Sequence, residues 1–241
     1  VRADLGRLEE ILILVSRLVT DYPEIKSLDM NPIRLNRGKP LIMDAEINLG
    51  RTNLVSPAHL IISPYPWWQE FTFSTRENEP IFIRPVRPGD APGIVALFES
   101  LSPETIYLRF FSPIKRISRS MLIRLTQIDY DREIALCAFH KKKSPPDAGI
   151  LGVARIIFNP GSKTGEFAVV LADDWQGKGV GTILLKRALK SAEKCGLKQV
   201  SGPVISTNEP MLALGKKLGF EVALDPESSE YRLTIDLKDL D

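Results

Sequence analysis

Apolar residues recur every three or four positions near the start of the chain. Over residues 3–25 this spacing predicts a helix with one apolar face, and Pro23 helps to end it. The apolar positions are Leu5, Leu8, Ile11, Leu12, Val15 and Leu18. Two short runs follow, 25–35 and 40–47, which are typical of strands joined through the polar turn "NRGK". A hairpin of this size cannot be stable alone.

The pattern changes at residue 51 and again at residue 80. Residues 51–79 hold three prolines and little periodicity, so we expect a linker, and the adjacent Trp67 and Trp68 indicate that it packs against a surface. Strand and helix patterns alternate from residue 80 onward. The predicted strands are 81–86, 132–141, 149–158, 165–174, 198–205 and 231–237, and the predicted helices or turns are 87–101, 102–113, 118–128, 179–196 and 209–219. This order predicts the α/β class with a mixed sheet in a domain of roughly 160 residues.

The composition limits the functions that fit. The chain has 241 residues, of which 44% are hydrophobic and 26% are charged, as in a folded globular protein. Its net charge of +2 produces no strong field, which argues against nucleic acid as a partner. The apolar run 11–15 is far shorter than the roughly 20 residues that cross a bilayer, and no signal peptide opens the chain, so we expect a cytoplasmic protein with no membrane partner. Because the chain begins without Met inside a helical pattern, we also expect a piece of a larger protein.

Cysteine and histidine give no sign of a metal site. Cys137 lies in an apolar strand-like run and Cys195 lies near a helix end, as structural thiols do. His59 and His140 are isolated from each other along the chain, so no zinc site is predicted.

Three glycines stand where an apolar strand becomes a helix. They are Gly177, Gly179 and Gly181, and the helix behind them has no further glycine until Gly196. Glycine enters positive φ without steric cost but weakens a helix by about 1 kcal/mol relative to alanine, so the cluster predicts a backbone that approaches a ligand closely. The N–H groups and the dipole of a helix N-terminus favour an anion there. The spacing fits neither a Walker loop, which needs Lys-Ser or Lys-Thr after the glycines, nor a strict G-x-G-x-x-G, because Leu184 stands at its last position.

The pattern Q-x-x-G-x-G at residues 176–181 resembles motif A of the GNAT superfamily of acyl-CoA-dependent N-acetyltransferases. In that family the backbone amides of this turn hold the pyrophosphate of coenzyme A. Asn208 and the closing run Leu218-Gly219-Phe220 resemble the family's second cofactor-contacting segment. The resemblance implies a GNAT fold with acetyl-CoA as cosubstrate. The cofactor-binding residues that it implies are Val169, Val170, Leu171, Gln176, Gly177, Lys178, Gly179, Val180, Gly181, Thr182 and Asn208.

Longer segments resemble a narrower group, the Pat-type bacterial protein lysine acetyltransferases. These segments are "LSPETIYLRFF", "TQIDYDREIALCAF" and "GEFAVVLADDWQGKGVG". In that group a GNAT domain is fused to an NDP-forming acyl-CoA synthetase region, and "SLDMNPIRL" and "LIMDAEI" resemble the end of its ATP-grasp domain. The resemblance implies a C-terminal ATP-grasp fragment over 1–50, a linker over 51–79 and a GNAT domain over 80–241. It also implies a protein lysine as acceptor, with acyl-CoA synthetases as the expected protein partners.

Acetyl transfer to lysine needs a base, because an amine with a pKa of about 10.4 is almost entirely protonated at pH 7. Glu166 is the candidate catalytic residue, and the resemblance implies the same role. Strand alternation places it with Ala168 and Val170 on one face, so we expect small apolar neighbours that raise its pKa. A solvated glutamate at a strand end is the alternative. Backbone amides beyond Val170 are expected to polarise the thioester carbonyl.

One position departs from the GNAT pattern, and two features stay open. Many members carry a Tyr as general acid four residues before the Gly-Phe pair; Gly215 stands there in this chain, which leaves protonation of the thiolate to water or another residue. A local acidic cluster consists of Asp129, Asp131 and Glu133. It either belongs to a solvated loop or attracts a cationic lysine substrate. Arg109 is open between a buried ion pair and a cofactor contact.

Asn31 and Asp44 suggest a metal site of a longer parent protein. In the ATP-grasp synthetases that residues 1–50 resemble, the matching Asn and acidic residue hold Mg²⁺ beside the nucleotide, and two hard oxygen ligands suit this ion. We expect the rest of such a site to lie upstream of Val1, so Mg-ATP is expected only in the full-length synthetase region and no metal is expected here. A common Asn-Pro turn explains Asn31 without a metal.

Three functions are therefore compatible with the sequence. The first is transfer of an acetyl group from acetyl-CoA to a protein lysine. The second is a regulatory module that senses acetyl-CoA for an NDP-forming acyl-CoA synthetase, and the third is acetylation of a small amine. The presence of Glu166 favours an enzyme over a sensor, whereas only the resemblance favours a protein acceptor.

Overall fold

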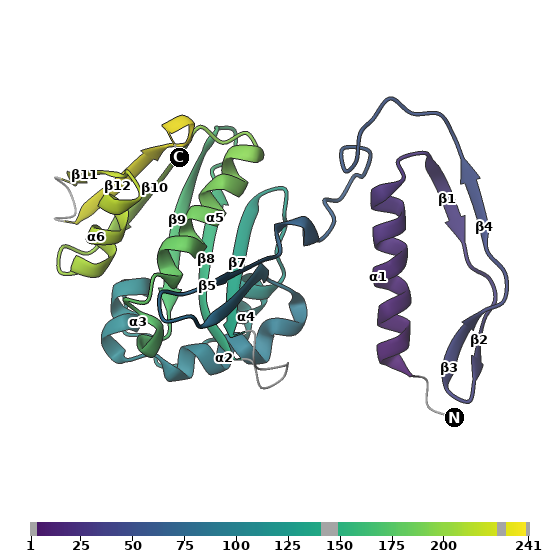
Figure 1. Cartoon of the computed structure of the whole chain (residues 1–241), viewed down its shortest axis with the longest axis horizontal. Helices are drawn as coiled ribbons and strands as arrows, with labels where there is room; N and C mark the ends of the chain where they lie inside the picture. Colours follow the sequence, from purple (N-terminus) through teal and green to yellow (C-terminus); the bar gives the residue numbers. More distant parts are fainter. Residues whose placement is uncertain (1–3, 141–148, 226–229, 240–241) are drawn as a thin grey trace. The chain divides into compact units, whose positions relative to one another are not determined.

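The computed structural model describes residues 4–140, 149–225 and 230–239. Contacts within the chain divide it into two compact units, Val1–Tyr65 and Pro66–Asp241 (Figure 1). No helix in these described ranges is both long enough and apolar enough to cross a bilayer.

The first unit consists of one helix and four short strands. Helix α1 (Leu5–Asp21) begins after Asp4, whose carboxylate accepts a hydrogen bond from the Arg7 N–H at 3.1 Å, as an N-cap does. The strands are β1 (Ile25–Asp29), β2 (Ile33–Asn36), β3 (Lys39–Ile42) and β4 (Glu46–Leu49). β2 and β3 form the predicted hairpin, with Arg37 and Gly38 at positive φ in its turn. The predicted strand 25–35 is divided into β1 and β2, and the predicted strand 40–47 is divided into β3 and β4. The outer strands β1 and β4 pair with each other, whereas β2 and β3 form the hairpin.

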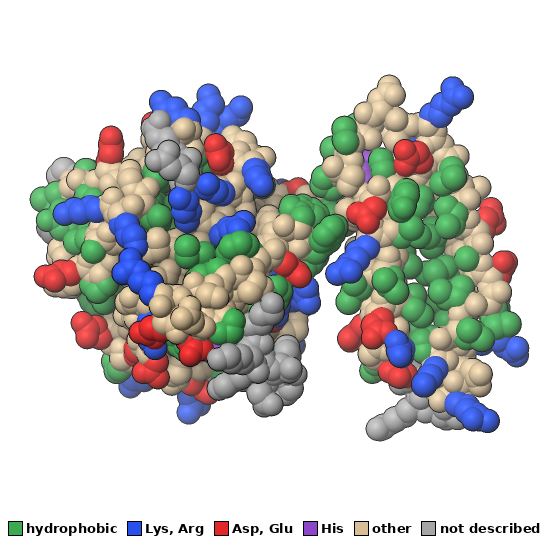
Figure 2. Space-filling view, in the orientation of Figure 1, with side chains coloured by type: hydrophobic (Ala, Val, Ile, Leu, Met, Phe, Trp, Pro, Cys, Tyr) green, Lys and Arg blue, Asp and Glu red, His purple; other side chains and the backbone are tan. Residues whose placement is uncertain are grey.

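Apolar side chains of this unit are largely uncovered. Thr20 is the one buried residue of α1. The exposed apolar residues include Leu5, Leu12, Ile13, Leu14, Leu35, Leu41, Ile47 and Leu49. Figure 2 shows hydrophobic side chains gathered over the surface of this unit. A small unit that leaves so much apolar surface in water is not stable alone.

The second unit is built on one eight-stranded sheet. Its order is β11-β12-β10-β9-β8-β7-β6-β5, and every neighbouring pair is antiparallel except β9 with β10. The strands are β5 (Phe71–Ser74), β6 (Pro80–Pro85), β7 (Glu133–His140), β8 (Ile150–Phe158), β9 (Thr164–Leu171), β10 (Gln199–Val204), β11 (Glu221–Leu224) and β12 (Tyr231–Asp236). One parallel pair among antiparallel strands confirms the predicted α/β class with a mixed sheet.

Helices pack on both faces of this sheet (Figure 1). They are α2 (Ala91–Ser100), α3 (Pro103–Phe110), α4 (Arg119–Thr126), α5 (Val180–Lys194) and α6 (Glu209–Lys217), with short 3-10 turns at Trp67–Gln69, Pro88–Asp90, Asp173–Trp175 and Leu237–Asp239. One buried cluster includes Leu185 of α5, and a second includes Leu97 of α2. On β9, Phe167 belongs to the first cluster and Val170 packs against the second, so alternate residues of this strand serve opposite faces.

The hydrophobic pattern does not predict the two edge strands of the sheet, β5 and β11. β5 lies within residues 51–79, where a linker was expected, because its alternation of Phe71 and Phe73 with polar residues is too short to be distinctive. β11 is equally short and follows α6 closely. Trp67 and Trp68 precede β5 with ring centroids 6.1 Å apart and with 40% and 47% of their side chains exposed, so they are less fully packed than expected.

Candidate active site

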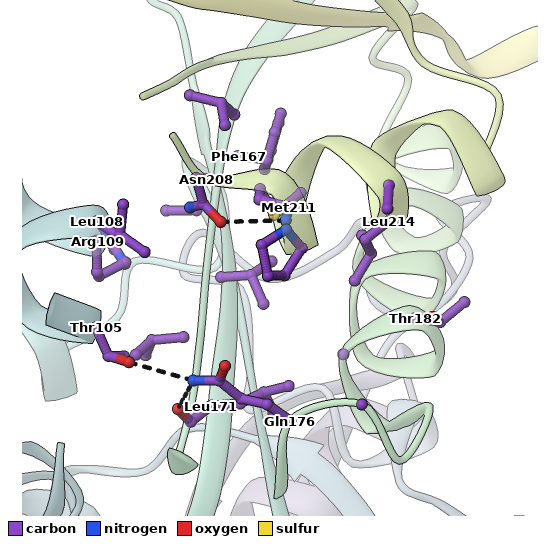
Figure 3. A pocket seen from close by; sticks show the side chains of 18 of the residues that line it. Thr105, Leu108, Arg109, Phe167, Leu171, Gln176, Thr182, Asn208, Met211 and Leu214 are labelled. Carbon is purple, nitrogen blue, oxygen red and sulfur yellow. Dashed lines mark hydrogen bonds between the residues drawn. The ribbon is translucent and has the colours of Figure 1, made fainter. Parts of the chain in front are cut away.

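A pocket of about 670 Å³ opens between β9 and β10 (Figure 3). The two strands pair only over Thr164 to Glu166 of β9, although β9 continues to Leu171 and β10 to Val204. Beyond that point α3, the start of α5 and α6 border the opening. Pro203 of β10 favours the separation because it has no N–H to donate to a neighbouring strand. The pocket therefore lies at the carboxyl end of the single parallel pair.

The predicted glycine turn forms one side of this pocket. Gly177 and Gly179 have φ values of +72° and +84°, and a Cβ at either position would meet nothing within 4 Å. The positive φ, and not a lack of space, therefore explains why glycine stands at both positions. Packing explains the glycine at position 181, because a Cβ there would lie 2.9 Å from Cδ1 of Leu171. Gly179 is the N-cap of α5, and no side chain caps this helix. Its first N–H groups thus fit an anion such as a phosphate.

Gln176 connects the turn to α3. Its Nε2 donates to Thr105 Oγ1 at 3.3 Å and to the Leu171 carbonyl at 3.5 Å (Figure 3). It also donates to Asp173 Oδ1 at 3.1 Å. The Asp173 carboxylate also accepts from the Ser102 N–H at 2.8 Å and from Thr105 Oγ1 at 2.6 Å. Burial raises the pKa of Asp173, but the hydrogen bonds from Thr105 and Ser102 outweigh it and hold that pKa below its ordinary value. The network fixes the turn against the first turn of α3.

Most residues that the resemblance assigns to the cofactor line this pocket. They are Val169, Val170, Leu171, Gln176, Gly177, Gly179, Gly181, Thr182 and Asn208. The side chains of Lys178 and Val180 lie elsewhere. Val180 is buried in the core, and the Lys178 ammonium lies 5.1 Å from the Trp175 ring centroid and 3.7 Å from the Glu77 carboxylate. A role for these two residues in binding therefore has to use their backbone groups.

The open edge of β9 presents backbone groups to the pocket. The N–H of Ala172 donates to the Leu151 carbonyl of β8 at 2.8 Å. Because strand residues alternate, the backbone N–H and C=O groups of Val170 and Ala168 also face β8. By alternation, Val169 and Leu171 direct their N–H and C=O groups to the opposite side, where β10 no longer pairs. The hydrogen bond from Gln176 to the Leu171 carbonyl agrees with this direction. The N–H groups of Val169 and Leu171 are therefore the amides that face the pocket.

Glu166 lies where β9 and β10 separate. It lines the pocket from the face of β9 that also carries Ala168 and Val170, as the alternation predicts. Its side chain is exposed, whereas small apolar neighbours were expected to enclose it. That expectation is wrong because the separation of the strands opens this part of the sheet to solvent.

Arg109 is a functional candidate that the sequence left unassigned. It extends from α3 (Figure 3), and it lines the same pocket as Glu166. Burial lowers the pKa of Arg109 to about 10; the positive charge of Arg155 lowers it as well, and the negative charge of Glu166 raises it. Glu166 is thus close enough to stabilise this guanidinium electrostatically.

Other lining residues were also missed. They are Arg76, Thr105, Leu108, Phe110, Phe111, Phe167, Ala168, Pro203, Val204, Pro210, Met211, Ala213, Leu214 and Lys217. For α3 a signal was present, because Thr105, Leu108 and Arg109 are spaced by three and four residues and share a helix face. Arg76 and Lys217 are exposed cations at the pocket, and a position of this kind suits further phosphate groups.

Gly215 occupies the position where many GNAT members carry Tyr. It is buried in α6, and the Leu233 side chain of β12 fills the space that a Cβ would need. The neighbouring Leu214 lines the pocket, and Asn208 accepts a hydrogen bond from the Met211 N–H at 3.1 Å at the start of the helix (Figure 3). No tyrosine occurs among the described residues that line the pocket. Position 215 therefore supplies no acid.

Introducing the family's tyrosine by Gly215→Tyr is expected to lower the stability by about 1–3 kcal/mol and to leave turnover no higher. The reason is overpacking against Leu233, since a buried site without space forces its neighbours to move. Chemical denaturation measures the change. Gly89→Tyr is the matched control, because Gly89 is exposed and a Cβ there would meet nothing within 4 Å. A Gly215→Tyr protein of unchanged stability and raised turnover would contradict this reasoning.

The acidic cluster does not face the pocket. Glu133 accepts a hydrogen bond from Arg155 Nη1 in a buried ion pair, and Asp129 lies 3.6 Å from Arg132 on an exposed turn. None of Asp129, Asp131 and Glu133 lines the pocket that the described residues form. A direct role in attracting lysine into this pocket is not supported.

Asn31 and Asp44 lie in two opposed loops of the first unit. Asn31 stands between β1 and β2, Asp44 stands between β3 and β4, and the Met43 N–H donates to the Pro32 carbonyl at 3.0 Å across the loops. Asp44 Oδ1 accepts from the Ala45 N–H at 3.0 Å. The described residues contain no group of three or more His, Cys, Asp or Glu side chains arranged to hold a metal.

Comparison with known proteins gives matches for both units. The sequence profile of the Acetyltransferase (GNAT) family matches residues 96–220, and the profile of the ATP-grasp domain matches residues 1–49. The chain is 30% identical over 156 residues to Acetyltransferase PA5475 of Pseudomonas aeruginosa, which is 65% of this chain and 83% of that protein. It is 26% identical over 181 residues to Acetyltransferase Pat of Mycolicibacterium smegmatis, which is 75% of this chain but only 50% of that protein. The crystal structure of the GNAT domain of S. lividans PAT superposes with a TM-score of 0.65 at 25% identity, over 71% of this chain and 99% of that domain.

Proposed function

The chain belongs to the GNAT family of acetyltransferases, and we propose that it transfers an acetyl group from acetyl-CoA to the ε-amine of a protein lysine. One observation carries the proposal: a single pocket has an uncapped helix N-terminus beside a glycine turn and the carboxylate of Glu166 among its lining residues. The helix N-terminus fits a phosphate, and the carboxylate fits a proton acceptor. The resemblance to Pat-type enzymes supports a protein acceptor.

In this proposal the turn residues bind the cosubstrate. The N–H groups at Gly177, Gly179 and the first turn of α5 hold the pyrophosphate, while Arg76 and Lys217 are placed to contact further phosphate groups. The gap between β9 and β10 receives the chain that leads from the phosphates to the thioester. Acetyl-CoA supplies an activated acyl carbon and a thiolate leaving group.

The remaining steps use side-chain and backbone groups of β9. A carboxylate oxygen of Glu166 takes one proton from the lysine ammonium, directly or through water, so that the neutral nitrogen can form the C–N bond while the C–S bond breaks. The N–H groups of Val169 and Leu171 stabilise the negative charge that develops on the carbonyl oxygen. Water carries the second proton of the attacking nitrogen to the departing thiolate, since position 215 holds glycine, and the products are the amide and the free thiol. With a thiol pKa of about 8.5, the thiolate leaves without a dedicated acid.

Isotope transfer from labelled acetyl-CoA to a panel of purified acyl-CoA synthetases tests the proposal. Label in a synthetase lysine is the expected result. Tight acetyl-CoA binding without transfer to any amine would show the sensing module instead, and transfer to small amines alone would show a small-molecule acetyltransferase.

The proposed organisation places an ATP-grasp fragment at 1–50, a linker at 51–79 and the GNAT domain at 80–241. The matches of the two family profiles to 1–49 and 96–220 support it. Pairing of β5 with β6 indicates that the linker ends before Phe71 rather than at residue 79. The apolar surface of the first unit is proposed to be covered by other protein.

We expect this chain to show no tight binding of Mg-ATP and no acyl-CoA synthesis. Asn31 and Asp44 can supply oxygen ligands to Mg²⁺, but both stand in exposed loops, and tight binding of a nucleotide needs a concave site that encloses most of its surface. Calorimetric titration with Mg-ATP is the measurement, and Asp29→Ala, another exposed aspartate of this unit, is the control for Asp44→Ala. Micromolar binding that Asp44→Ala removes and Asp29→Ala keeps would overturn the expectation.

A further inference from the structure

A buried cation, Arg155, and a half-buried cation, Arg109, meet behind the pocket. A second cavity, of about 40 Å³, shares Arg109, Phe110 and Val170 with the main pocket. Arg155 also lines this cavity, and only 4% of its surface is exposed. Two guanidinium groups from different elements therefore border one small space adjoining the main pocket.

The register of the sheet explains how they come together. Arg155 of β8 lies opposite Ala168 of β9, and Ala168 stands between Glu166 and Val170 on the same face of that strand. Helix α3, which packs on β9, carries Arg109 to the same cavity. Arg109 thus borders both this cavity and the pocket that Glu166 lines.

Arg155 has a donor that its protein partners do not use. Its Nη1 donates to Glu133, and its Nη2 donates to the Leu125 carbonyl at 2.5 Å. Its Nε is buried with no hydrogen-bond partner in the described part of the chain. A buried N–H of this kind is a natural partner for an acceptor oxygen of a ligand, because leaving it unpaired is unfavourable.

Arg109 adds a second cation with little compensation. Among the described residues it makes no hydrogen bond or ion pair, and its guanidinium carbon lies 4.9 Å from the Phe110 ring centroid. Glu133 is hydrogen-bonded to Arg155, and Glu166 interacts with Arg109, but Glu166 is exposed in the main pocket and solvent screens its charge. The balance favours one further negative charge.

We propose that Arg109 and Arg155 form a carboxylate subsite beside Glu166, which binds a carboxylate group of one of the two substrates. This inference rests on the proposed acyl transfer and deepens it by naming a substrate class. A planar guanidinium matches a carboxylate in geometry and charge, and about 40 Å³ exceeds the space that one water needs. The carboxylate belongs either to a dicarboxylic acyl group on coenzyme A or to an acidic residue beside the acceptor lysine of the protein substrate.

Two matched pairs of compounds distinguish these sources. Succinyl-CoA and butyryl-CoA both carry four-carbon acyl groups, but only the first has a terminal carboxylate, and calorimetry compares their affinities. The peptides acetyl-Gly-Lys-Glu-amide and acetyl-Gly-Lys-Gln-amide both offer a lysine ε-amine and are nearly equal in size, but only the first has a carboxylate, and KM compares them with acetyl-CoA as donor. The wild-type chain is expected to prefer the carboxylate member of one pair by about 10- to 100-fold.

Arg109→Gln is expected to abolish that preference, and Arg109→Lys is expected to retain part of it because the charge remains. Each preference is a ratio within one variant, so a general loss of binding cancels, and circular dichroism reports folding. Loss of the succinyl preference supports the donor as source, and loss of the preference for the glutamate-containing peptide supports the acceptor. Equal use of both members of both pairs by the wild type, or a preference unchanged in Arg109→Gln, overturns the subsite. Failure of the proposed function is distinct, since the wild type would then transfer no acetyl group to either peptide.

Discussion

Replacing Glu166 with glutamine is expected to lower turnover by about 10² to 10⁴ while the affinity for acetyl-CoA changes little. Glutamine keeps the size and the polarity of the side chain but cannot accept the proton of the lysine ammonium. Glu166 is the one carboxylate among the described residues that line the pocket, so no second side chain of this kind is placed to replace it. Steady-state kinetics from pH 6 to 9 with calorimetry of acetyl-CoA measure both quantities.

Glu221→Gln serves as the control for this substitution. Glu221 is an exposed strand glutamate like Glu166, but it does not line the pocket, so its removal is expected to leave turnover within about twofold. Near-wild-type turnover of the Glu166→Gln chain across the whole pH range would falsify its role as the base. Equal losses in both variants would point to stability instead.

Gly179→Asp is expected to raise the dissociation constant of acetyl-CoA by about 10² or more. The substitution places a carboxylate at the N-cap of α5, where the pyrophosphate is proposed to lie, and juxtaposed like charges cost several kcal/mol. Aspartate also has to adopt a φ of +84°, which adds backbone strain unrelated to the ligand. Calorimetry with acetyl-CoA gives the dissociation constant, and thermal denaturation shows that the variant is folded.

Gly161→Asp separates the two effects. Gly161 has a φ of +72°, and a Cβ there would meet nothing within 4 Å, so its environment matches that of Gly179 apart from the pocket. It lies between β8 and β9 and does not line the pocket. The control is expected to lose stability by a similar amount and to keep its affinity. An unchanged affinity in a folded Gly179→Asp chain would refute the phosphate site at this turn.

Local signals in the sequence were sufficient for most elements of the second unit. The strand of residues 164–171, the glycine turn and α5 follow from hydrophobic periodicity and from the conformational freedom of glycine, which act over a few residues. The same signals place Glu166 and Phe167 on opposite faces of one strand. The family could be inferred for the same reason, because the motif and its secondary-structure context are contiguous. Short edge strands such as β5 gave no comparable signal, since four residues contain too little periodicity.

Only the tertiary structure decided what surrounds these residues. Glu166 is exposed because β10 separates from β9, Gly215 carries no side chain into the pocket because Leu233 fills that space from another strand, and Arg109 meets Arg155 although 45 positions lie between them. Each of these facts depends on contacts between segments far apart along the chain, and side-chain patterns within one segment do not encode such contacts. The sequence therefore determined which backbone turn and which strand carry the site, whereas packing between distant elements determined its exposure, its charges and the space available to a ligand.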